Sequence, residues 1–196
     1  MKKLHSIWLI VGLLLLLFVS FSNGQTSRRD TYWAQPEKVM DVVGVTEGMV
    51  IGEAGAGEGY LTFYLSKRVW PTGKIYANDI DDNALETVKR RYQREGINNI
   101  TTVIGDIADP LFPDQKLDMI IMLRAFHDFE NQEEWLVNAK KYMKPEAPLV
   151  IIDGHDKHTR LNKEKVLKMA DDAGFELTQY ETFLPSDFIY VFKLKQ

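Results

Sequence analysis

Cysteine is absent from this sequence of 196 residues. Its absence excludes disulfide-stapled scaffolds, zinc–thiolate sites, thiol-based catalysis and attachment of a lipid through cysteine. A chain without thiols also suits an oxidising compartment, where an unpaired cysteine is a liability. The chain is long enough to form one domain around a single hydrophobic core.

An excess of positive charge is also missing. The formal net charge is −4, and removing Lys2 and Lys3 with the first 24 residues takes it to −6. We therefore expect no nucleic-acid partner. Basic residues do cluster between Lys89 and Arg94, but they share one predicted helix with Val88 and are typical of a solvated helix face.

Only one long apolar run is present, and it lies at the N-terminus. Two lysines precede the apolar stretch from Ile7 to Phe21, and Ser22 and Gly24 place small residues where a signal peptidase reads the chain. The run is short for a membrane span, which needs about 20 apolar residues. We expect residues 1–24 to be a cleaved signal peptide, with an uncleaved N-terminal anchor as the alternative. The protein is then expected to be exported, periplasmic or secreted, and to meet the membrane only if this segment is retained.

The remainder reads as a lead-in segment, residues 25–35, followed by one domain, residues 36–196. Pro36 is typical of the first position of a helix, and Gly44 marks the end of that helix.

The stretch from Val50 onward predicts a strand, a glycine turn and a helix. The apolar strand ends at Glu53, glycine then occupies every second position at Gly55, Gly57 and Gly59, and a helical pattern follows at once. Such a turn lets backbone approach a ligand closely, and it aims the N-terminus of the helix at an anionic group.

Two nucleotide-binding interpretations of this turn fail at Tyr60. A phosphate-binding P-loop needs Gly-Lys-Ser/Thr at its end, whereas Gly59 is followed by Tyr60 and Leu61. A dinucleotide fingerprint needs a small residue at the position of Tyr60, where close packing of helix on strand leaves no room for a ring. A dehydrogenase is therefore disfavoured.

The remaining pattern, Glu-x-Gly-x-Gly-x-Gly, resembles motif I of class I S-adenosylmethionine-dependent methyltransferases. A second strand follows and ends at Asp79, twenty residues after Gly59, and a third runs into Gly105 and Asp106. The apolar run from Leu117 to Leu123 suits a buried parallel strand. The resemblance extends roughly from Trp33 to Phe192.

The resemblance implies an α/β fold: a Rossmann-like, doubly wound sheet of seven strands, mostly parallel, with an antiparallel last strand. It also implies that the cofactor S-adenosyl-L-methionine lies across the ends of strands one, two and four. In that family the acidic residue of motif I, here Glu53, bonds the amino group of the methionine part, and the turn's N–H groups meet the carboxylate. Asp79 would bind the ribose hydroxyls, and Asp106 with Ile107 would frame the adenine. The expected cofactor-binding residues are Glu53, Gly55, Gly57, Gly59, Asp79, Ile80, Asp106 and Ile107.

The loop after the fourth strand holds the candidate catalytic residue, His127. Many small-molecule methyltransferases of this class carry an aromatic–histidine pair here, so the resemblance implies a general base facing the substrate. The alternative is a histidine that only hydrogen-bonds the loop or the cofactor. Trp33 is either a pocket-lining residue or an aromatic packed at the edge of the core.

A second polar loop, from Asp153 to His158, contains two histidines and two aspartates. A metal site is one interpretation, because imidazole and carboxylate bind first-row metals. We expect no metal, because structural sites of this kind draw ligands from more than one element. The alternative is a polar rim of the substrate cleft.

Together these features predict methyl transfer from S-adenosylmethionine to an unidentified small molecule. A non-catalytic exported binding module that retains the fold is the alternative. This alternative arises for two reasons. The chain lacks a large insertion that could cover an acceptor, and the cofactor is made in the cytoplasm whereas residues 1–24 predict export.

Overall fold

The computed structural model describes residues 35–113, 117–155 and 160–196. One compact unit spans Gln35–Gln196. The expected signal peptide, nearly all of the lead-in segment and Trp33 lie outside the described residues. Within the described ranges, no helix is both long and apolar enough to cross a membrane.

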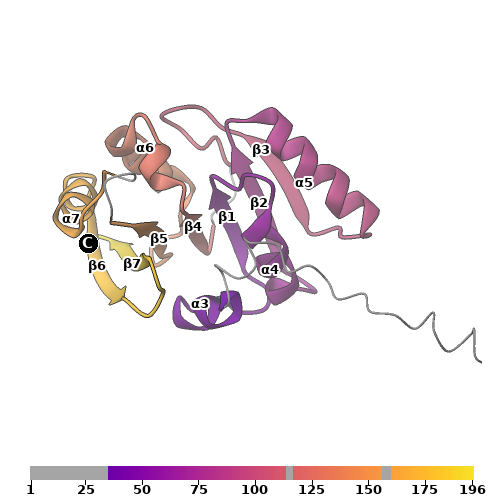
Figure 1. Ribbon diagram of the computed structural model, residues 1–196, viewed down its shortest axis with the longest axis horizontal. Coiled ribbons are helices and arrows are strands. Elements are labelled where there is room, and N and C mark those ends of the chain that lie inside the picture. The colour runs from indigo at the N-terminus through magenta and orange to yellow at the C-terminus, as the bar shows by residue number, and fades with distance from the viewer. Residues whose placement is uncertain (1–34, 114–116, 156–159) are drawn as a thin grey trace, which may run out of the picture. The chain divides into compact units, whose positions relative to one another are not determined.

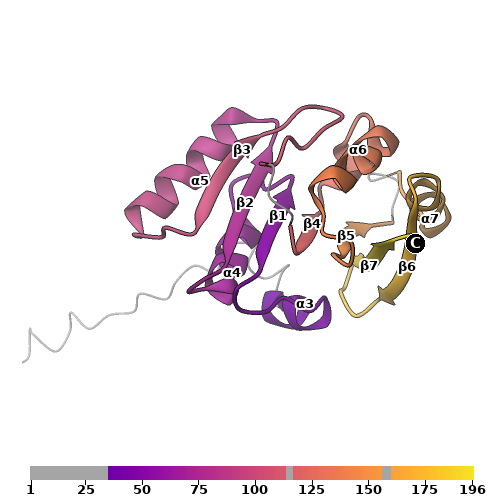
Figure 2. The ribbon, with the colours of Figure 1, turned by 180° about the vertical axis from the view of Figure 1, so that it is seen from behind.

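Seven strands form one mixed sheet in the order β3-β2-β1-β4-β5-β7-β6. The first five in this order are parallel, and β7 runs antiparallel to both of its neighbours. The predicted α/β sheet is therefore confirmed (Figure 1 and Figure 2). The strands are β1 (Val50–Ala54), β2 (Lys74–Asp79), β3 (Ile100–Ile104), β4 (Met119–Leu123), β5 (Leu149–Gly154), β6 (Phe175–Glu181) and β7 (Asp187–Leu194).

Helices precede the sheet and join its parallel strands. They are α3 (Pro36–Val42), α4 (Tyr60–Val69), α5 (Asp82–Arg94), α6 (Gln132–Ala139) and α7 (Lys163–Asp172), with the short 3-10 helices η1 (Phe126–Asp128) and η2 (Lys140–Tyr142). The strand order reverses between β1 and β4. Right-handed crossovers then place α4 and α5 on one face of the sheet and α6 on the other. This reversal is where open α/β sheets form a ligand crevice, at the carboxyl ends of the strands.

The central strands are enclosed on both faces. The side chains of Met119–Met122 in β4 and Leu149–Ile152 in β5 have no solvent exposure. Their continuous apolar sequences reflect this burial, because a parallel strand covered by helices on both sides has no polar face. The rigid core therefore fixes the strand ends that carry the polar residues.

Two element boundaries differ from the sequence prediction. Strand β4 begins at Met119 rather than Leu117. The apolar spacing from Glu133 to Lys144 predicts one helix, whereas α6 ends at Ala139 and continues as η2. One pairing explains both: the Leu117 N–H donates to the Tyr142 carbonyl (2.7 Å), and the Lys144 N–H donates to the Leu117 carbonyl (3.0 Å). The chain leaves the helix in a tighter turn to make these bonds beside the entry to β4.

Candidate functional site

The glycine turn connects β1 to α4 at the carboxyl edge of the sheet. Gly55 and Gly59 have positive φ angles of 70° and 82°, a conformation that favours glycine. A side chain at position 55 would also have no room, because a Cβ atom on Gly55 would overlap the Cβ of Ala125. The backbone of the turn therefore lies directly against the loop that follows β4.

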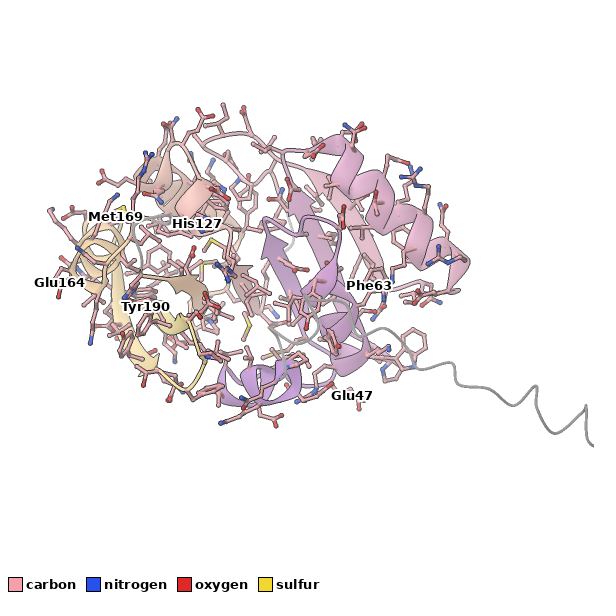
Figure 3. The ribbon with its side chains drawn as sticks, in the orientation of Figure 1. Glu47, Phe63, His127, Glu164, Met169 and Tyr190 are labelled. Carbon is pink, nitrogen blue, oxygen red and sulfur yellow. The ribbon has the colours of Figure 1, made fainter. Side chains whose placement is uncertain are left out.

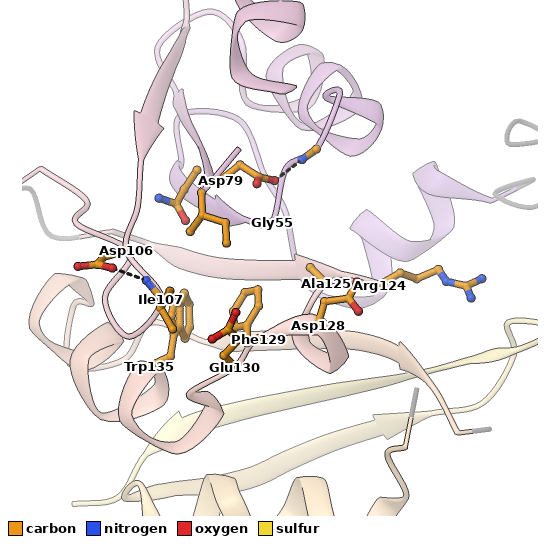
Figure 4. Close-up of a pocket in the computed structure, with 13 residues that line it drawn as sticks. Gly55, Asp79, Asp106, Ile107, Arg124, Ala125, Asp128, Phe129, Glu130 and Trp135 are labelled. Carbon is orange, nitrogen blue, oxygen red and sulfur yellow. Dashed lines mark hydrogen bonds between the residues drawn. The ribbon is translucent and has the colours of Figure 1, made fainter. Parts of the chain in front are cut away.

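A pocket of about 310 Å³ opens beside this turn, within the usual size of a small-molecule site. Figure 4 shows the residues that line it. Glu53 and Gly59 are outside this lining. The other six residues expected to bind the cofactor are part of it: Gly55, Gly57, Asp79, Ile80, Asp106 and Ile107. The parallel topology explains their meeting, because the ends of β1, β2 and β3 share one edge of the sheet.

Asp79 ties the tip of β2 to the glycine turn. Its Oδ2 accepts a hydrogen bond from the Gly57 N–H (2.8 Å), and its Oδ1 accepts one from the Asp81 N–H (3.0 Å). The sequence predicted ribose hydroxyls as the partners of both oxygens. Each carboxylate oxygen accepts more than one hydrogen bond, so the observed bonds orient the group and leave acceptor capacity toward the pocket.

Glu53 lies behind the turn rather than in the pocket wall. Its side chain is 2% exposed, and its Oε2 accepts a hydrogen bond from the Thr62 hydroxyl (2.6 Å). Burial raises the pKa of Glu53 to about 8; the Thr62 bond opposes this shift, and the negative charge of Asp79 reinforces it. The predicted bond from Glu53 to the amino group of the cofactor stays a prediction.

The part of the pocket beyond β2 and β3 combines apolar surface with a fixed loop. Ile80 and Ile107 are 60% and 40% exposed, and both line the pocket. The Asp106 carboxylate accepts from the Ile107 N–H (2.7 Å), and the Asn78 amide donates to the Pro110 carbonyl (2.7 Å). The two isoleucines thus present exposed apolar surface to the pocket beside this loop. Asn78, which also lines the pocket, was missed by the sequence analysis.

The facing wall comes from the loop after β4 and from α6. It consists of Arg124, Ala125, Asp128, Phe129, Glu130 and Trp135. The rings of Phe129 and Trp135 are 5.0 Å apart between centroids and tilted by 51°, and they lie next to each other in Figure 4. The sequence predicted that this loop reaches the site, but it singled out His127 and none of these six residues.

His127 is held between two carboxylates and lies outside the pocket wall. Its Nδ1 is 2.9 Å from Asp153 Oδ1, and its backbone N–H donates to Asp153 Oδ2 (3.0 Å). On the other side its Nε2 is 3.3 Å from Asp128 Oδ2. The ring is 9% exposed. His127 therefore contacts a pocket-lining residue, Asp128, without lining the pocket itself. Its role as a general base stays a prediction.

The two described members of the second polar loop have separate partners. Asp153 bonds His127, whereas His155 stacks on Phe188 (4.1 Å between ring centroids) and lies 2.5 Å from the Tyr190 hydroxyl through Nε2. Asp156 and His158 lie outside the described residues. In the ranges that the structure describes, no three His, Cys, Asp or Glu side chains come close enough to hold a metal ion. His127 and Tyr190 both belong to the β4, β5 and β7 side of the sheet (Figure 3).

Known proteins share this sequence pattern and fold. A family model described as "Methyltransferase domain" matches residues 45–183. The crystal structure of a SAM-dependent methyltransferase from Aquifex aeolicus superposes with a TM-score of 0.79 at 26% identity, covering 86% of this chain and 94% of that chain.

Two curated relatives match over shorter stretches. A ubiquinone/menaquinone biosynthesis C-methyltransferase from Hydrogenovibrio crunogenus is 24% identical over 58% of this chain and 45% of its own length. A 2-phytyl-1,4-naphtoquinone methyltransferase from Trichormus variabilis is 31% identical over 50% of this chain and 44% of its own length. The chain thus spans less than half of these relatives. The family model, the Aquifex structure and the glycine-turn pocket agree: this chain belongs to the family of class I S-adenosylmethionine-dependent methyltransferases.

Proposed function

We propose that the protein binds S-adenosylmethionine in the pocket between the glycine turn and the β4 loop and transfers its methyl group to a small molecule. The observation that carries this proposal is the meeting of the glycine turn, the Asp79 carboxylate and the exposed Ile80–Ile107 pair on one wall. The glycine turn suits the methionine part of the cofactor, Asp79 suits the ribose, and the isoleucine pair suits the adenine.

The cofactor, when bound, would supply a methyl carbon on a sulfonium; an in-line nucleophile would attack that carbon, and the sulfur would leave as a neutral thioether. The nucleophile forms the new bond to carbon, and the electrons of the carbon–sulfur bond stay on sulfur. The chain contributes alignment, which is worth several kcal/mol when the reacting atoms are held close and collinear. Gly55 and Ala125 set that alignment, because their contact fixes the distance between the two walls.

The acceptor we propose is a hydroxylated aromatic ring. One curated relative is named as a C-methyltransferase of ubiquinone/menaquinone biosynthesis, and the other as a 2-phytyl-1,4-naphtoquinone methyltransferase. The Phe129–Trp135 pair gives this pocket an aromatic surface of its own, and aromatic rings pack favourably in tilted contacts. A phenol must lose a proton during transfer, which is the step that a base in the β4 loop would serve.

Calorimetry of the full chain with S-adenosylmethionine, S-adenosylhomocysteine and NAD is the first experiment. We expect binding of the first two and none of NAD. Absence of binding by both sulfur compounds, or preference for NAD, would overturn the proposal.

A transfer assay with labelled methyl donor then tests the acceptor, using naphthoquinols, simple phenols, thiols and amines. We expect label in the hydroxylated aromatic compounds. Cofactor binding without label in any compound of the panel would favour the binding-module alternative, and label only in thiols or amines would contradict the proposed acceptor class.

A further inference from the structure

The charges on the pocket wall are strongly unbalanced. Among the described residues that line it, four are carboxylates and one is a guanidinium: Asp79, Asp106, Asp128, Glu130 and Arg124. The backbone bonds of Asp79 and Asp106 assign them to the β2 and β3 ends of the pocket. The other two carboxylates belong to the β4 loop, and none of the interpretations above gives them a task.

Asp128 is the better fixed of these two. The His127 ring lies 3.3 Å from its carboxylate, and that ring is itself anchored by the buried Asp153. The Asp128 N–H donates to the Ala125 carbonyl (3.0 Å), which closes the η1 turn. Among the described residues, no hydrogen bond or ion pair holds the Glu130 side chain.

Asp128 also belongs to the part of the β4 loop that packs on the glycine turn. Its turn begins at Ala125, whose Cβ packs directly over Gly55. In Figure 4, Asp128 is beside Ala125, whereas Glu130 is beside Phe129. The Phe129 ring also lies 3.7 Å from the position of an added Gly55 Cβ. The loop on both sides of Asp128 therefore packs on the turn to which the proposed function assigns the methionine part of the cofactor.

We infer that Asp128, positioned by the Asp153–His127 pair, recognises the positive charge of the sulfonium and makes the pocket prefer the methyl donor to the demethylated product. This inference rests on the proposed function. S-adenosylmethionine and S-adenosylhomocysteine differ by one methyl group and one positive charge, so a carboxylate near sulfur attracts only the former. The Asp128 side chain is 78% exposed, and in such a solvated site a charge pair a few ångströms apart changes affinity by about three- to tenfold.

The test is calorimetry of the full chain with both compounds. In Asp128→Asn we expect about three- to tenfold weaker binding of S-adenosylmethionine and less than twofold change for S-adenosylhomocysteine. His127→Gln is expected to shift the ratio of the two dissociation constants in the same direction but less, because the carboxylate stays and only its orientation is lost. Raising salt should lower the preference in wild type more than in Asp128→Asn.

Two variants separate this role from a general loss of negative charge. Glu134→Gln removes an exposed carboxylate on α6 outside the pocket and should leave both affinities within twofold. Glu130→Gln removes a pocket carboxylate that no hydrogen bond or ion pair among the described residues holds in place, and it should shift the ratio less than Asp128→Asn. If Asp128→Asn leaves the ratio of the two dissociation constants unchanged, the inference is overturned while the proposed function stays intact. Failure of wild type to bind either compound rejects the proposed function itself.

Discussion

Glu53 is a carboxyl group enclosed by protein behind the glycine turn. Because burial raises its pKa to about 8 in the folded chain from an ordinary 4.5, the folded state holds a proton that the unfolded state has lost between these two pH values. Stability from this group is therefore fully present below pH 4.5 and is lost as the pH rises toward 8. The loss amounts to at most about 1.4 kcal/mol per pH unit.

Glu53→Gln should remove this pH dependence, because an amide of the same shape does not ionise. Relative to this variant, wild type should lose about 1–3 kcal/mol of unfolding free energy between pH 5 and pH 8. Urea unfolding at several pH values measures it, with Glu47→Gln as the control for loss of an exposed carboxylate. Parallel curves for wild type and Glu53→Gln would show that Glu53 is not protonated in the folded chain.

Asp79 supplies a prediction that concerns binding rather than stability. Asp79→Asn leaves one acceptor oxygen and no charge, and hydrogen bonds to a charged group are worth about 1.5–3 kcal/mol each. We expect S-adenosylhomocysteine to bind about 10- to 100-fold more weakly. The matched change Asp82→Asn, at the exposed start of α5, should bind as wild type does. Unchanged affinity in Asp79→Asn would remove Asp79 from the site.

At the scale of elements, the loop after β4 shows the limit of sequence reasoning. Its place at a strand end was predictable, because a buried apolar run stops at Leu123. The direction of each side chain was not. Arg124 adopts a positive φ of 47°, and the 3-10 turn that follows directs His127 toward the buried Asp153 and leaves Asp128 on the pocket wall. The direction of the His127 side chain depends on Asp153, 26 residues away in the sequence. The residues around His127 alone could not have predicted it.

The glycine turn permits a direct test of how tightly the two walls meet. Gly55→Ala combines an unfavourable positive φ with overlap onto Ala125, so we expect a loss of about 2–4 kcal/mol in unfolding free energy. Gly44→Ala is the matched control: φ is also positive, 79°, but no atom lies within 4 Å of the added Cβ. That variant should lose only about 1 kcal/mol. Equal losses in thermal or urea unfolding would mean that backbone strain alone, not contact, requires Gly55.

For the molecule as a whole, the order of strands and helices followed from the sequence. The central strands β1, β4 and β5 are largely apolar, and a glycine or polar residue follows or closes each of them: Gly55, Arg124 and Gly154. These boundaries recur in the order that a doubly wound sheet requires. The sequence predicted one wall of the pocket better than the other. The β1, β2 and β3 side was identified from glycine and acid spacing, whereas Trp135 lies on a helix whose apolar pattern equally suits a purely structural core residue.

Export is a prediction that concerns residues 1–24, outside the described ranges. We propose that residues 1–24 are removed, on the basis of the basic start, the short apolar run and the small residues at Ser22 and Gly24. Intact-mass measurement of the protein from its native envelope should give a chain that begins at Gln25. A mass that includes the first 24 residues would indicate an anchor instead.

The two walls of the pocket come from separate stretches of chain. The wall expected to hold the cofactor ends at Ile107, and the facing wall lies entirely within residues 124–135. This separation has a consequence for protein engineering. Exchanging residues 124–135 with the equivalent segment of another family member would alter which acceptor is recognised while the β1–β3 wall is inherited unchanged, provided that a small residue is kept at position 125 beside Gly55 and the Asp128 carboxylate is kept for the donor.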